Sequence, residues 1–160
     1  MIHDLGYMDN IQYLKFHDGV VEKLMEFYRK GYKLIVLTNQ EKVALGYFKE
    51  QRVHDINEQI NRKLERHGVQ IDAFYHCTHH PSHVCSCMKP RTGMLEQAAA
   101  EHDISLADSV IVGGTDDLRM GLSASVEAYA VKTHLTVFDR RLAELDGVHF
   151  VGSMHDVKIR

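Results

Sequence analysis

Short apolar runs alternate along the chain with stretches that place apolar residues on one helical face. Residues 33–37 (KLIVL) predict a buried parallel strand, and residues 71–75, 109–112, 127–131 and 148–151 predict further strands. Helical patterns cover residues 19–29, 49–66 and 93–102, and another helix is expected to begin near Asp116 or Asp117. This alternation predicts an α/β fold, a three-layer, doubly wound (Rossmann-like) parallel sheet.

Length and composition narrow the class of protein. A chain of 160 residues with 44% hydrophobic and 26% charged residues suits one soluble domain, so we expect a single domain over residues 1–160. The net charge of -3 disfavours a nucleic-acid partner. No run approaches the roughly 18 apolar residues of a membrane helix, and no signal peptide is visible. We therefore expect a cytoplasmic protein without a membrane partner.

All three cysteines lie in one loop, residues 77–87, together with several histidines. An odd number of closely spaced cysteines favours a metal site over disulfides. The thiolates of Cys77, Cys85 and Cys87 and the imidazole of His79, in a C-x-H pair with Cys77, suit a tetrahedral structural zinc. The alternative is a loop without metal. Other histidines of the segment stay open as the fourth ligand: His76, His80 and His83.

Two short segments carry side chains suited to a phosphoryl group. Thr38 and Asn39 follow the strand predicted at residues 33–37, and ligands of an open parallel sheet bind beyond the carboxyl ends of its strands. A hydroxyl and backbone amides there can donate to phosphoryl oxygens, although the segment also fits a helix cap or a turn. Lys89 follows the cysteine loop and either neutralises a phosphoryl group or is a solvated surface lysine.

These segments resemble the histidinol-phosphatase and heptose-bisphosphate-phosphatase branch of the haloacid dehalogenase-like hydrolases. Residues 37–48 (LTNQEKVALGYF) are similar to a family stretch in which T-N-Q precedes G-Y-F. Residues 75–95 look like the family's zinc loop leading into C-R-K-P-x-P-G-M. Residues 4–7 (DLGY) resemble the D-x-G-Y after the first motif, and residues 110–125 resemble the fourth motif with its helix. The resemblance covers almost the whole chain.

The resemblance implies a phosphatase that acts on a small phosphorylated metabolite, heptose bisphosphate or histidinol phosphate. Family members form an aspartyl-phosphate, use a second aspartate two residues later as acid and base, and bridge the phosphoryl group with magnesium. On this match Thr38 would bind the phosphoryl group and Lys89 would steady it. Asp117 would be a weak magnesium candidate.

The chain differs from the family pattern at the catalytic motifs. No D-x-D occurs in the 160 residues, and residue 1 falls where the family has finished its first strand and nucleophile turn. Gly114 stands at the magnesium-binding aspartate of V-G-D-x-x-x-D, and Asp117 matches the second aspartate only with one residue deleted. Glu41 and Lys42 replace S-G, and Met88 replaces an arginine.

We therefore expect little or no phosphatase activity and poor magnesium affinity from these 160 residues. The alternative to a small-metabolite phosphatase is a catalytically silent domain that binds a ligand or a partner. A polynucleotide 3′-phosphatase is the third and least favoured interpretation, because the chain is slightly acidic and lacks a basic stripe. The family's first strand would lie between the strands at residues 33–37 and 109–112. We expect these two strands to pair directly, or other residues to fill the gap, because an unsatisfied buried backbone group costs roughly 1–3 kcal/mol.

Overall fold

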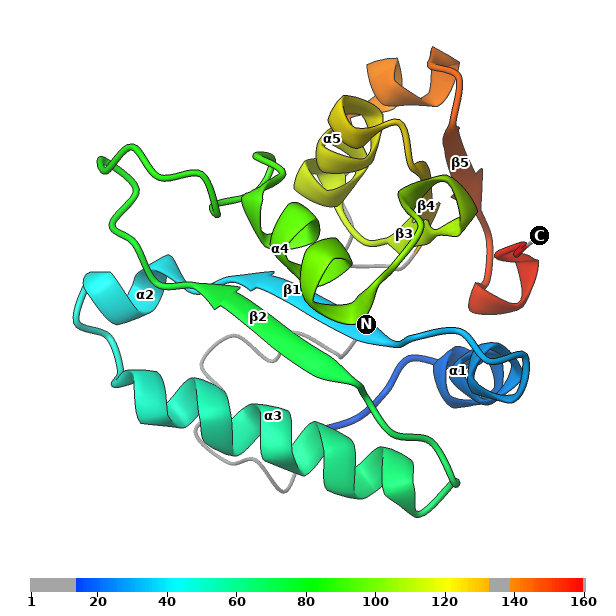
Figure 1. The fold of residues 1–160 in the computed structure, drawn as a ribbon, viewed down its shortest axis with the longest axis horizontal. Helices are drawn as coiled ribbons and strands as arrows, with labels where there is room; N and C mark the ends of the chain where they lie inside the picture. Colours follow the sequence, from blue (N-terminus) through cyan, green and yellow to red (C-terminus); the bar gives the residue numbers. More distant parts are fainter. Residues whose placement is uncertain (1–13, 133–138, 160) are drawn as a thin grey trace.

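The computed structural model describes residues 14–132 and 139–159, which form parallel strands layered with helices (Figure 1). The helices are α1 (Val20–Arg29), α2 (Glu41–Ala44), α3 (Glu50–Glu65), α4 (Gly93–His102) and α5 (Thr115–Ala124). The strands are β1 (Ile35–Asn39), β2 (Ala73–Cys77), β3 (Val110–Val112), β4 (Glu127–Val131) and β5 (Val148–Val151). Short 3-10 helices cover Leu106–Asp108, Arg140–Glu144 and Met154–Asp156. Residues 4–7, which resemble a family motif, lie outside the described residues.

The described strands form two parallel sheets, β1–β2 and β3–β4–β5. In the first sheet the register runs from Ile35 opposite Ala73 to Asn39 opposite Cys77. In the second sheet β4 lies between β3 and β5. Parallel strands joined through helices confirm the predicted α/β class.

The helices follow the predicted apolar periodicity. In α1, Val20 and Phe27 are buried on one face, and Gly31 takes a left-handed φ of 83° just after the helix, as a C-terminal stop requires. In α3, Val53 and Ile60 are buried. Within the described residues, no helix combines the length and the apolarity needed to span a membrane.

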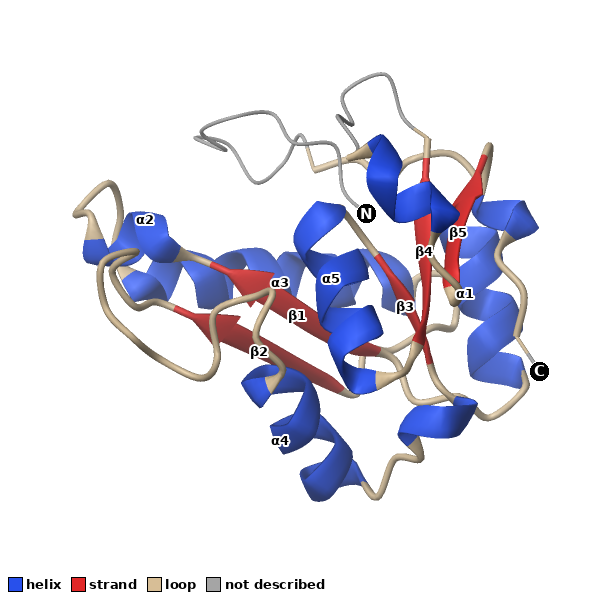
Figure 2. Ribbon diagram, turned by 90° about the horizontal axis from the view of Figure 1, so that it is seen from above, coloured by secondary structure: helices blue, strands red, loops and turns tan. Residues whose placement is uncertain are grey.

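Helices α3 and α4 cover opposite faces of the β1–β2 sheet (Figures 1 and 2). The largest core cluster joins α1 and α3 to Tyr129 of β4 and Met154 near the C-terminus. A second cluster packs Leu118 of α5 against Ala128 and Val148 of the second sheet. A third cluster brings Leu95, Met120 and Val126 together between α4 and α5. These core contacts hold the two sheets together. The carboxyl ends of β1 and β3 both line one cavity, which lies between the sheets.

The two sheets do not merge, and Figure 2 shows their strands as separate groups. A cavity of about 1080 Å³ lies between them and is lined by every residue of β1 and β3. No described strand occupies this space. The expectation that these two strands pair directly is therefore wrong, and no described strand fills the gap between them. The reason is that α4 packs on β1 and β2 while α5 packs on β3 and β4, so each sheet keeps its own helix and the facing edges stay apart.

Candidate functional site

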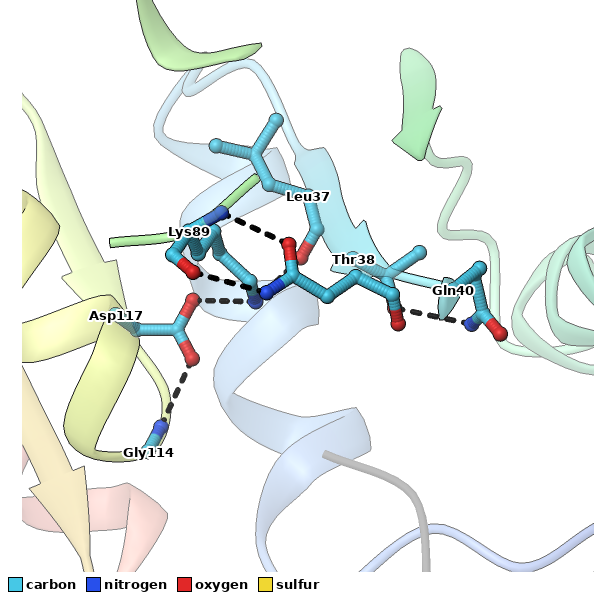
Figure 3. Close-up of polar contacts among 7 residues, drawn as sticks. Leu37, Thr38, Gln40, Lys89, Gly114 and Asp117 are labelled. Atoms are coloured by element: carbon cyan, nitrogen blue, oxygen red, sulfur yellow. Dashed lines mark hydrogen bonds and ion pairs between the residues drawn. The ribbon is translucent and has the colours of Figure 1, made fainter. Parts of the chain in front are cut away.

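Lys89 follows the cysteine loop and contacts both β1 and α5 at the carboxyl end of β1 (Figure 3). Its Nζ donates to the carbonyl oxygen of Leu37 at 2.9 Å and to Oδ1 of Asp117 at 2.7 Å. Its side chain is only 12% exposed and that of Asp117 only 18%. A charge held at low exposure by two contacts is positioned rather than freely solvated, which disfavours the surface-lysine alternative.

Asn39 fixes the backbone of Lys89. Its Nδ2 donates to the Lys89 carbonyl at 3.0 Å, and its Oδ1 accepts from the Lys89 amide at 2.9 Å. Both polar atoms of the Asn39 side chain are thus engaged with the main chain across the gap between β1 and the cysteine loop. Asn39 thus positions Lys89, and its predicted role in substrate binding stays a prediction.

Thr38 lines the cavity at the end of β1. Its Oγ1 accepts from Nε2 of Gln40 at 3.1 Å and lies 3.4 Å from the carbonyl oxygen of Asn39. The second distance is long for a hydroxyl donor, whose hydrogen bonds usually span about 2.5–3.0 Å. The hydroxyl hydrogen of Thr38 is therefore weakly used inside the protein and is available to a ligand oxygen.

The turn before α5 holds Asp117 in place. Its Oδ2 accepts from the amide of Gly114 at 3.0 Å, so both carboxylate oxygens have partners (Figure 3). A Cβ added at Gly113 would lie 2.3 Å from the Asp117 carboxyl carbon, whereas one at Gly114 would meet nothing within 4 Å. Asp117 thus serves as a cap of α5 and partner of Lys89. Gly114 has no side chain, so Asp117 is the only carboxylate that these two positions offer. One carboxylate that is already paired with Lys89 does not fit a magnesium ion, which prefers octahedral oxygen ligands.

The charges around the carboxyl ends of β1 and β3 favour an anion. The described residues that line the cavity there include the cationic side chains of Lys42, Arg52 and Lys89 and the carboxylates of Glu41 and Asp117. Glu41, which with Lys42 replaces the S-G of the family pattern, thus lines the cavity. The local balance is positive although the chain as a whole is acidic, and such local charge is what a phosphorylated ligand requires.

The loop between β2 and α4 gathers the four predicted zinc ligands. His79 Nδ1 lies 3.3 Å from Cys77 Sγ and 3.1 Å from Cys87 Sγ, and Cys85 Sγ lies 3.8 Å from Cys77 Sγ. All four ligand atoms lie within 4.8 Å of one another, and the cysteines form no disulfide. Three sulfurs and one imidazole nitrogen at this spacing fit a tetrahedral metal ion.

The protonation of the cluster also fits a cation. Burial, and after it the neighbouring sulfurs of Cys77 and Cys85, raise the pKa of the Cys87 thiol to about 12. Without a bound cation the Cys87 thiol therefore keeps its proton, and a metal ion bound by the cluster would displace that proton.

Two of the alternative histidine ligands have other partners. His80 Nδ1 contacts Ser82 Oγ at 2.7 Å, and His76 contacts Glu50.

Known proteins with similar sequences are phosphatases. A family model described as polynucleotide kinase 3 phosphatase matches residues 6–152. The D-glycero-beta-D-manno-heptose-1,7-bisphosphate 7-phosphatase of Haemophilus influenzae is 37% identical over 131 residues, which are 78% of this chain and 71% of that protein. The protein of the same name from Haemophilus ducreyi is 38% identical over 141 residues, which are 84% of this chain and 75% of that protein.

A solved structure shares the fold. The D,D-heptose 1.7-bisphosphate phosphatase of B. bronchiseptica, in complex with magnesium and phosphate, superposes with a TM-score of 0.79. Its sequence is 23% identical, and the match covers 92% of this chain and 84% of that one. This chain therefore belongs to the polynucleotide kinase 3 phosphatase family, in the heptose-bisphosphate-phosphatase branch of the haloacid dehalogenase-like hydrolases.

Proposed function

We propose that these 160 residues bind a small phosphorylated sugar at the cavity between β1 and β3 and turn it over slowly or not at all. The observation that carries the proposal is Lys89, a cation held at low exposure beside Thr38 at the cavity. Thr38 supplies a hydroxyl donor and Lys89 a charge for the phosphoryl oxygens. Heptose bisphosphate is favoured over histidinol phosphate because the similar phosphatases bear that name.

Weak or absent turnover follows from the carboxylates at the site. A phosphatase of this family needs two aspartates two residues apart, and no such pair occurs in the 160 residues. Asp117 is engaged by Lys89 and Gly114, and Glu41 adds negative charge beside the phosphate position. The remaining groups bind and orient a phosphate without a described nucleophile to receive it.

The cysteine loop is proposed to hold one structural zinc ion. Cys77, His79, Cys85 and Cys87 would occupy all four positions of a tetrahedral site, so the ion would bind no reacting water. Its role would be to fix the loop that ends at Lys89, two residues after Cys87 in the sequence. The metal would thus support the phosphate site without taking part in chemistry.

Binding of heptose bisphosphate, measured by calorimetry, tests the phosphate site. Lys89→Met should weaken binding at least about tenfold, because hydrogen bonds to charged groups contribute roughly 1.5–3 kcal/mol. Thr38→Ala should weaken binding by about two- to tenfold, the loss of one neutral hydrogen bond.

The matched control is Lys49→Ala, since Lys49 is exposed and does not belong to the cavity lining. Its affinity should equal that of the unmodified chain. Thermal unfolding of each variant separates loss of binding from loss of folding. Unchanged affinity in both Lys89→Met and Thr38→Ala would overturn the proposed site.

A further inference from the structure

Three side chains form a second cluster of metal-ligating groups, apart from the cysteine loop. Glu50 and His54 are one turn apart at the start of α3, so they project from the same face of the helix. His76 of β2 faces them: its Nε2 contacts Glu50 Oε1 at 2.7 Å, and its ring packs edge-on against His54 with centroids 5.2 Å apart. The three ligand atoms lie within 4.8 Å of one another.

The cluster differs from an ordinary surface ion pair in how His76 is held. Its side chain is 14% exposed, while Glu50 is 51% exposed and His54 is also on the surface. The Nδ1 of His76 is buried and has no hydrogen-bond partner among the described residues. Such atoms are uncommon in native proteins. Among the described residues the ring of His76 is therefore held by its hydrogen bond to Glu50 alone, and its Nδ1 is available to a further ligand.

The chemistry of the donors selects the kind of ion. Two imidazoles and one carboxylate suit zinc, nickel, cobalt or copper, whereas magnesium prefers oxygen ligands alone. With bonds of about 2.0–2.2 Å to zinc, tetrahedral ligand atoms lie about 3.3–3.6 Å apart, so Oε1 of Glu50 and Nε2 of His76, now 2.7 Å apart, would have to separate slightly to admit the ion. The exposed side chains of Glu50 and His54 can make that movement by small rotations.

The position is independent of the cysteine cluster and of the cavity. Neighbouring residues of a strand point to opposite faces, so His76 faces α3 while Cys77 points away from it. None of Glu50, His54 and His76 is among the described residues that line the cavity. A metal ion bound here would therefore meet neither the thiolates nor the phosphate site.

We propose that Glu50, His54 and His76 form a second metal site that takes a divalent late first-row transition ion. Three protein ligands leave one coordination position open to solvent or to an exogenous ligand, unlike the four-ligand cysteine site. The site would join the start of α3 to the end of β2 on the face of the sheet opposite the cysteine cluster.

Zinc titration of the metal-stripped full chain tests the site, with cobalt as a spectroscopic probe. Two equivalents should bind: cobalt in the cysteine cluster gives intense thiolate charge-transfer bands, and cobalt in the second site gives only weak visible bands. His54→Ala should weaken the second equivalent at least about tenfold, by comparison with the 10–100-fold effect of losing groups that merely support metal ligands. His54 is chosen because it is exposed, whereas His76 adjoins Cys77 and is largely buried.

His67→Ala is the matched control, because His67 is an exposed histidine just beyond the same helix and outside the cluster. It should bind two equivalents with unchanged affinity, and Glu50→Gln should behave like His54→Ala. Binding of a single equivalent with thiolate bands would overturn the second site. So would equal second-equivalent affinity in His54→Ala and His67→Ala.

Discussion

Gly113 and Gly114 are adjacent in the sequence but carry different steric constraints. The carboxylate of Asp117 fills the space beside Gly113, while the space beside Gly114 is open. A Cβ at position 114 would therefore meet no neighbour. The absence of an aspartate there is a chemical difference from the family pattern, with no steric cause in this structure.

We expect Gly114→Asp to raise magnesium affinity at least about tenfold by placing a second carboxylate beside Asp117. The melting temperature should change little, because the added Cβ meets no neighbour. Calorimetric titration with magnesium measures the gain, and Gly113→Ala serves as the steric comparison that should lose stability. Equal magnesium affinity in Gly114→Asp and the unmodified chain would show that the site lacks more than one carboxylate.

Individual residues differ in how far the sequence could place them. The cysteine cluster was predictable because its ligands are close in the chain, and the structure brings Cys77 and His79 together as the C-x-H spacing suggests. The Glu50–His76 contact was not predictable, since it spans 26 positions and depends on how β2 packs against α3. The contacts of Asn39 with Lys89 were likewise not predictable, because they span 50 positions and depend on the fold.

The first residue of helix α4, Gly93, contacts the end of the cysteine loop. The amide of Gly93 donates to the carbonyl oxygen of Ser86 at 3.1 Å, and a Cβ at Gly93 would lie 2.6 Å from that oxygen. We expect Gly93→Ala to destabilise the chain by about 1–3 kcal/mol through overpacking. Gly114→Ala is the control, with open space at its Cβ position. Urea unfolding should distinguish them, and equal midpoints would argue against a tight loop–helix junction.

Strand β2 and helix α4 are also linked through Tyr75 and Glu101. Burial, and after it the hydrogen bond to Glu101, raise the pKa of Tyr75 to about 12. Because the folded pKa lies above the ordinary value of 10.0, the contribution of Tyr75 to stability is present below pH 10 and is lost as pH rises toward 12. We expect Tyr75→Phe to be less stable than the unmodified chain at neutral pH. Above pH 10 the stability of the variant should fall less steeply than that of the unmodified chain. Unfolding midpoints that fall in parallel for both proteins would contradict this link.

The elements were predicted well where apolar and polar positions separate cleanly. Helix α4 and strands β4 and β5 have the predicted bounds. Strands β1 and β2 begin and end two residues later than predicted, because the parallel ladder starts at Ile35 and Ala73 and includes the polar side chains of Thr38–Asn39 and His76–Cys77. The short helix α2 was not predicted, since four residues give too little periodicity for a pattern.

At the scale of the whole molecule, the cavity between the sheets was not predictable from local pattern. Each strand near it has the apolar composition of a buried strand, and nothing in that composition says which neighbour it pairs with. The cavity exposes one edge of β1 and one of β3 to the same space among the described residues. The cores around α1, α4 and α5 hold the sheets together across it.

Removal of the proposed zinc ion should loosen the molecule around the cysteine loop. We expect a chelator to lower the melting temperature by on the order of 10 °C, since a structural zinc contributes several kcal/mol to folding. Added zinc should restore the transition, and added magnesium should not. A melting curve that chelation leaves unchanged would show that the loop folds without metal.

The most direct measurement is phosphate release from D-glycero-beta-D-manno-heptose 1,7-bisphosphate by the purified 160-residue chain in the presence of magnesium. The same assay is run on Lys89→Met, and binding of the compound to both proteins is measured by calorimetry. Our account predicts binding that depends on Lys89 and little or no phosphate release. Phosphate release that is rapid in the unmodified chain and abolished by Lys89→Met would contradict it and would require a nucleophile outside the described site.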